Sequence, residues 1–100
     1  MNVNVRSIHF DADSKLVDFI NEKLAKLTLF HDQILGGDVF LRLEHDGESR
    51  ENKQVEIRLN VPGNDLFAKR KGKTFEEAVI STVEALRSQA TRNAEVRKAG

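Results

Sequence analysis

The sequence contains no cysteine, tryptophan or tyrosine, and it has one proline among its 100 residues. Without cysteine the fold uses neither disulfides nor thiolate-bound metal, which suits a reducing compartment, so we expect a cytoplasmic protein. No apolar run approaches the roughly 20 residues that a membrane span requires, and the first ten residues lack the apolar core of a signal peptide. These absences predict a soluble globular protein whose residues 1–100 form a single domain.

A net charge is also missing, because 16 basic residues balance 16 acidic ones. The two signs are unevenly distributed along the chain. Residues 1–68 carry eight basic and twelve acidic side chains, a balance of −4, whereas residues 69–100 carry eight and four, a balance of +4. Such separation within one small domain favours a surface that faces a polyanion, although uneven surface charge is also common without any partner.

Hydropathy patterns predict the element order β-α-β-β-β-α. Alternation of apolar and polar residues predicts four strands, and an apolar residue every three or four positions predicts two helices. The expected strands are residues 2–8, 38–46, 54–61 and 65–71, and the expected helices run from Asp11–Ser14 to about Phe30 and from Thr74 to about Arg92. Gly36–Gly37 should break the pattern, residues 46–53 should form a hairpin loop, Pro62–Gly63 should make a turn, and residues 93–100 should be a frayed or disordered tail.

These elements predict an α+β fold, in which a four-stranded, largely antiparallel sheet has both helices packed on one face. The order is similar to that of double-stranded RNA-binding folds. The last helix opens with Thr74-Phe-Glu-Glu77, a sequence typical of a capping box in which the two outer residues satisfy each other's backbone donors.

Catalytic and metal-binding patterns are missing from the sequence. His9, His31 and His45 lie in three different elements without metal-ligand spacing, so we expect unpaired surface histidines. No nucleophile triad or glycine-rich phosphate loop is present. We therefore expect no enzymatic activity, no metal, no cofactor and no small-molecule substrate.

Basic residues offer the remaining functional signal. Lys23 lies beside the apolar face of the first helix, where its stem can cover apolar surface or its ammonium can be aimed outward at a polyanion. Arg87 and Arg92 should lie on the two flanks of the last helix. Phe40 and Phe67 should face away from the core, where they could contact a protein or be covered by neighbouring side chains.

The chain resembles the ribosome hibernation factors, also described as ribosome-associated translation inhibitors, in their short form. The resemblance rests on the element order and on "VDFINEKLAKL", "DVFLRLEHD" and "LFAKRKGKTFEEAV", and it covers Val3 to about Arg92. It implies binding to the small ribosomal subunit and its ribosomal RNA, in the channel of messenger and transfer RNA. It also implies inhibition of translation in stationary phase or stress, and leaves room for a separate ribosome-dimerisation factor as a partner.

In this resemblance Lys23 and Lys26 match the basic residues of the first helix, Arg42 matches one on the second strand, and Arg92 matches one on the last helix. Ala85, Ser88 and Ala94 stand where basic residues are frequent, so the edge of the last helix is depleted. Instead, the four basic residues of Lys69–Lys73 are hypothesised to clamp phosphate at the start of the last helix, beside Lys23 and Lys26.

The predicted RNA-binding residues are Lys23, Lys26, Arg42, Lys69, Arg70, Lys71, Lys73, Arg87 and Arg92. The cluster at 69–73 could alternatively be a solvated segment that protects an edge strand with lysine. Two other function classes stay open: a general double-stranded RNA-binding module, and a protein-interaction domain that uses the sheet face carrying Phe40 and Phe67.

Overall fold

A computed structural model describes residues 2–29, 31–44 and 51–99, with the backbone alone for residues 93–99. The predicted α+β class and its element order are confirmed. The elements are β1 (Asn2–Ile8), α1 (Ser14–Thr28), β2 (Gly36–Leu43), β3 (Lys53–Asn60), β4 (Leu66–Gly72) and α2 (Phe75–Ala99). Residues 46–50 of the predicted hairpin loop lie outside the described residues, as does His45.

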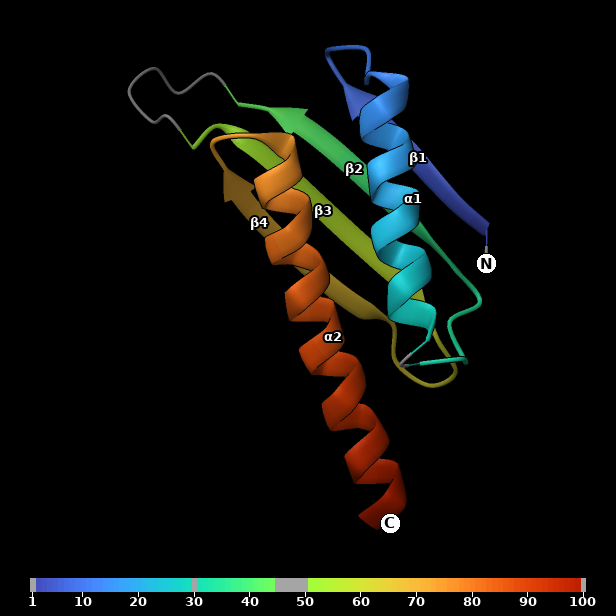
Figure 1. Cartoon of the computed structure of the whole chain (residues 1–100). Helices are drawn as coiled ribbons and strands as arrows, with labels where there is room; N and C mark the ends of the chain where they lie inside the picture. The colour runs from blue at the N-terminus through green and yellow to red at the C-terminus, as the bar shows by residue number, and fades with distance from the viewer. Residues whose placement is uncertain (1, 30, 45–50, 100) are drawn as a thin grey trace.

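The sheet has the strand order β1-β2-β3-β4, and both helices cover the same face of it (Figure 1). β1 pairs with β2 in parallel, while β2 with β3 and β3 with β4 are antiparallel. β4 therefore runs in the same direction as β1 and β2. Each helix returns antiparallel to these strands, so α1 and α2 are parallel to each other and begin at the same end of the sheet (Figure 1).

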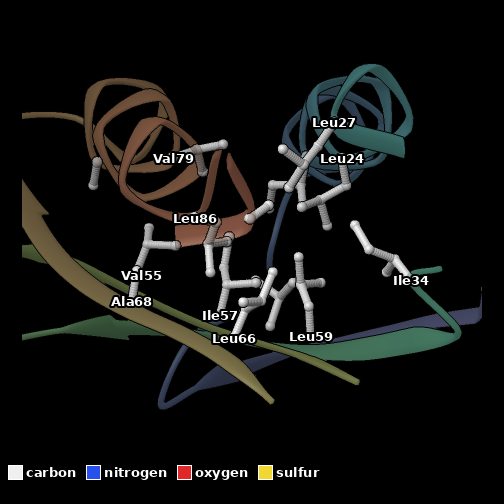
Figure 2. Close-up of a cluster of buried hydrophobic side chains, with 14 of the residues drawn as sticks. Leu24, Leu27, Ile34, Val55, Ile57, Leu59, Leu66, Ala68, Val79 and Leu86 are labelled. Carbon is white, nitrogen blue, oxygen red and sulfur yellow. The ribbon is translucent and has the colours of Figure 1, made fainter. Parts of the chain in front are cut away.

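The hydrophobic core fills the space between the helices and one face of the sheet (Figure 2). Side chains at alternate positions of β3 point into it, as the sequence pattern predicted. Those of α1 come from one helical stripe of four buried residues, spaced three or four positions apart as the hydropathy pattern predicted. These strand and helix contributions are Val55, Ile57 and Leu59 from β3, and Leu16, Ile20, Leu24 and Leu27 from α1. Burying each such side chain stabilises the fold by about 1.5–3 kcal/mol.

Gly36 and Gly37, which were predicted to break the pattern ahead of a strand that starts at residue 38, are instead the first two residues of β2. A Cβ at Gly36 would lie 2.7 Å from the backbone oxygen of Asn2, and one at Gly37 would lie 2.7 Å from that of Arg58. The neighbouring strands approach β2 too closely here for any side chain, which explains the glycines. The predicted turn at Pro62–Gly63 is confirmed, with Gly63 at a φ of 92°.

The helix α2 continues past Arg92 to Ala99, so the predicted helix boundary near Arg92 is wrong. The apolar stripe fades there, but residues 93–99 contain neither proline nor glycine to stop a helix. The expectation that residues 93–100 fray stays a prediction. Among the described residues, no helix has the length and apolar character needed to span a membrane.

Candidate nucleic-acid interface

Seven of the nine predicted RNA-binding residues lie on opposite sides of the sheet, whereas Arg70 lies at the sheet edge and Lys73 in the connection between β4 and α2. We call the outer surface of the two helices, with Lys23, Lys26, Arg87 and Arg92, the helix layer. We call the sheet face without helices, with Arg42, Lys69 and Lys71, the open sheet face. The sequence predicted the residues of both surfaces as RNA-binding, but it did not show that they lie on two different surfaces.

The basic cluster at 69–73 is divided by the alternation of β4. Ala68 is buried under the helices, whereas Lys69 and Lys71 contact polar side chains of the open sheet face. Arg70 lies on the side of Ala68, at the sheet edge, and its guanidinium donates to the backbone oxygen of Lys69 at 2.9 Å. The hypothesis of one clamp beside the α1 lysines is therefore wrong, because successive strand residues point to opposite faces.

The start of α2 has already used backbone donors that could hold a phosphate. Thr74 Oγ1 accepts from the N–H of Glu77 at 3.1 Å, as a capping box requires. The carboxylate of Glu77, however, accepts from the N–H of Lys73 at 3.2 Å and not from that of Thr74, which corrects the second half of the predicted box. Glu76 also lies in the first turn, and the negative charges of these two glutamates make this helix start less favourable for a phosphate.

Two lysines of α1 differ in their surroundings. Lys23 is half-buried, and its Nζ lies 5.2 Å from the centroid of the Phe19 ring. A cation–π contact holds the ammonium in place without neutralising its charge. Lys26 is more exposed and lies 3.7 Å from Glu22, one turn earlier. An exposed pair of this kind contributes only about 0.3–0.5 kcal/mol, so Lys26 can exchange it for another anion.

On α2, Gln89 fixes the orientation of the helix, because its side chain hydrogen-bonds the backbone of Phe67 on the edge strand β4. Arg87 lies about 200° round the helix from Gln89 and therefore points away from β4, toward the α1 side. A shallow groove on α2 is lined by Arg87 and Arg92 together with Glu84, Ser88 and Thr91. Arg92 lies about 140° round the helix from Arg87, so the two arginines border this groove from opposite sides. This arrangement is compatible with the expectation that they occupy the two flanks, which stays a prediction.

The cations of the open sheet face have anionic or polar partners. Arg42 Nη1 lies 3.1 Å from the carboxylate of Glu56, and Lys71 Nζ lies 2.7 Å from that of Glu44. With the Gln54 amide oriented to suit its neighbours, its oxygen accepts from Lys69 Nζ at 3.2 Å and its nitrogen donates to Glu44. A polyanion approaching this face would have to displace these contacts.

Phe40 and Phe67 lie on the open sheet face, as predicted, and both are covered by arginine. The Arg42 guanidinium lies 5.5 Å from the ring centroid of Phe40, and that of Arg58 lies 5.5 Å from the ring of Phe67. Phe67 is still 40% exposed. Arg58 was not singled out from the sequence, although its outward position in the predicted strand and its pairing with Phe67 give it a defined role.

The expectation of surface histidines holds for His9 but is wrong for His31, which is 9% exposed. The N–H of His31 donates to the backbone oxygen of Leu27 at 3.2 Å, which continues the end of α1 and turns the imidazole inward. Its Nδ1 has no hydrogen-bond partner among the described residues. Within those same residues, no group of three or more His, Asp or Glu side chains could hold a metal ion.

Comparison with known proteins places this arrangement in a family. The chain is 25% identical over 95 residues to a ribosome hibernation promoting factor of Pseudomonas putida, an alignment that covers 95% of this chain and 88% of the relative. Two solved structures share the fold. A ribosomal subunit interface protein from Coxiella burnetii matches with a TM-score of 0.83 at 16% identity, over 95% of this chain and 99% of the other. The Thermus thermophilus Protein Y N-terminal domain matches with a TM-score of 0.78 at 24% identity, over 92% and 98%. The model of the sigma 54 modulation protein / S30EA ribosomal protein family matches residues 3–98, so the chain belongs to that family.

Proposed function

We propose that this protein is a ribosome hibernation factor that binds the small ribosomal subunit in the messenger and transfer RNA channel and inhibits translation in stationary phase or stress. Its role is binding to ribosomal RNA in the cytoplasm, without catalysis. The observation that carries the proposal is the family match over residues 3–98. The names of the similar proteins, a ribosome hibernation promoting factor and a ribosomal subunit interface protein, point to the same partner.

The helix layer is the better candidate for the RNA-binding surface. Lys23 is positioned by an aromatic ring, and among the described residues Lys26 makes one exposed ion pair. Both can therefore take a phosphate as a new partner at little cost. On the open sheet face Arg42 and Lys71 already contact carboxylates, and losing those contacts would offset part of any gain from RNA.

Recognition should depend on phosphate and shape, with little base stacking. The described phenylalanines of the open sheet face are partly covered by guanidinium groups, and Phe10 and Phe75 stack on each other with ring centroids 5.0 Å apart. Single-stranded RNA recognition generally requires aromatic rings free to stack on bases. A folded RNA surface such as that of a ribosomal subunit offers phosphates in a fixed arrangement, which suits fixed cations.

The test is co-sedimentation of the purified protein with small subunits, with whole ribosomes and with free RNA duplex, across a series of salt concentrations. We expect salt-sensitive binding to the small subunit and to whole ribosomes, and much weaker binding to duplex. Messenger RNA added in excess should compete for the same channel. In a translation assay, the protein should lower the yield at concentrations that occupy the small subunit.

Equal affinity for duplex would instead identify a general double-stranded RNA-binding module. Binding that ignores salt would point to a protein contact, because phosphate contacts release counterions and are therefore weakened by salt. Failure to bind either subunits or ribosomes would refute the proposal.

A further inference from the structure

The two edges of the sheet differ in how their backbone groups are satisfied. A strand at an edge has outward N–H and C=O groups that can pair with another strand, and proteins usually block such edges. β1 and β4 are the two edge strands here. The contrast between them suggests which edge is available to a partner.

The edge at β4 is blocked at Phe67 by a side chain of α2. The amide of Gln89 donates to the backbone oxygen of Phe67 at 2.6 Å and accepts from the N–H of Phe67 at 3.1 Å. The side chain thus makes the two hydrogen bonds that a neighbouring strand would make. Two β4 strands that paired antiparallel about their centre would also set Lys69 against the same lysine of the second copy, which is unfavourable.

The outer edge of β1, in contrast, makes no hydrogen bond to any residue that the structure describes. A hollow lies beside it, between β1 and α1. The helix side of this hollow is lined by the small or polar side chains of Asn21, Ala25 and Thr28. They leave room for the side chains of an added strand. Asp32 also lines the hollow and no lysine or arginine does, so the surface does not suit a polyanion.

The sequence of β1 is compatible with pairing to its own copy. Two seven-residue strands that pair antiparallel about Val5 overlap completely. This register sets Arg6, the one charged residue of the strand, opposite Asn4 of the second copy. It sets Val3 opposite Ser7 and Val5 opposite itself, so that no like charges meet.

We propose that a second copy of this chain adds to the sheet at β1, forming a symmetric dimer with a continuous eight-stranded sheet. The interface consists of one short strand pair and its adjacent hollow, which is smaller than the interface of a permanent dimer. We therefore expect weak association, with a dissociation constant on the order of 0.1 mM.

Sedimentation equilibrium from about 10 µM to 1 mM tests this association, and amide spectra over the same range locate it. Asn4→Lys would set a new positive charge opposite Arg6 at two symmetric positions, and should weaken the dimer by roughly 2- to 30-fold. The fold should tolerate the lysine, since Asn4 lies 3.4 Å from Asp38. Adding Arg6→Glu to Asn4→Lys should restore association, because opposite charges then face each other. Ser88→Lys adds the same charge on α2 and should have no effect.

Thermal unfolding of each variant establishes that it is folded before its association is compared. A wild-type protein that stays monomeric up to 1 mM would overturn the proposal and leave the β1 edge to the strand of a different protein. A dimer that Asn4→Lys does not weaken, or that the double variant does not restore, would also overturn it by placing the contact elsewhere. No ribosome enters this experiment, so its result is independent of the proposed function.

Discussion

Replacing Lys23 and Arg87 together by alanine tests whether the helix layer is the surface that binds ribosomal RNA. One residue lies on each helix, and alanine has the highest helix propensity, so both helices should form in the variant. If all four cations of the helix layer contact phosphate, log affinity should fall with log salt with a slope of about −2.8 to −3.6, because each contact contributes about −0.7 to −0.9. The variant keeps two contacts, which gives a slope of about −1.4 to −1.8.

The difference between these slopes is large enough to measure. A fourfold rise in salt, from about 50 to 200 mM, should weaken the wild-type protein by about 50- to 150-fold and the variant by about 7- to 12-fold. The assay is co-sedimentation with small ribosomal subunits at several salt concentrations, with the unbound protein quantified in the supernatant.

The matched control is the double replacement of Lys69 and Lys71 by alanine, which removes the same charge from the open sheet face. These lysines already contact Gln54 and Glu44, so we expect them not to contact RNA phosphates. The control variant should therefore keep the salt dependence of the wild-type protein. If the control has the shallower slope and the helix-layer variant keeps the wild-type slope, the open sheet face carries the RNA contacts and the helix layer does not.

Three further predictions concern single residues. Glu22→Gln should strengthen small-subunit binding by about 1.7- to 2.3-fold in the same sedimentation assay, because it frees Lys26 from an exposed ion pair; unchanged binding would show that Lys26 does not contact RNA. Gln89→Ala should lower the free energy of unfolding by about 1–2 kcal/mol in urea and speed amide exchange at Phe67, because two hydrogen bonds are lost; exchange at the wild-type rate would contradict the blocked edge at Phe67. Gly37→Ala should lower the free energy of unfolding by about 1–3 kcal/mol, since its Cβ would lie 2.7 Å from a backbone oxygen of β3; wild-type stability would mean that the strands can move apart.

Much of the fold was predictable because each element has its own period. The alternation in β3 identified Val55, Ile57 and Leu59 as core residues, and the helical stripe identified those of α1. The glycine pair was misread because glycine has two uses in a sequence. It stops elements, and it also permits close approach of backbones, and only the positions of the neighbouring strands distinguish the two at Gly36 and Gly37.

The candidate site was less predictable, for two physical reasons. The pattern of β4 already implied that Lys69 and Lys71 share a side with Phe67, but grouping the cations by sequence distance hid this. Contacts between segments that are distant in the sequence left no pattern in the sequence from which they could be predicted. Neither the hydrogen bonds of Gln89 to Phe67 nor the burial of His31 follows from any local period, because each depends on how the elements pack.

The parallel direction of α1 and α2 has an electrostatic consequence for the whole domain. The macrodipole of each helix is equivalent to about half a positive charge at the helix start. Because α1 and α2 are parallel, these two partial charges lie at the same end of the sheet and repel each other. Asp13 caps the start of α1, and Glu76 and Glu77 lie in the first turn of α2. These three carboxylates offset the repulsion that the element order imposes. Neutralising them to increase attraction for RNA would therefore loosen the helix pair that presents the cations.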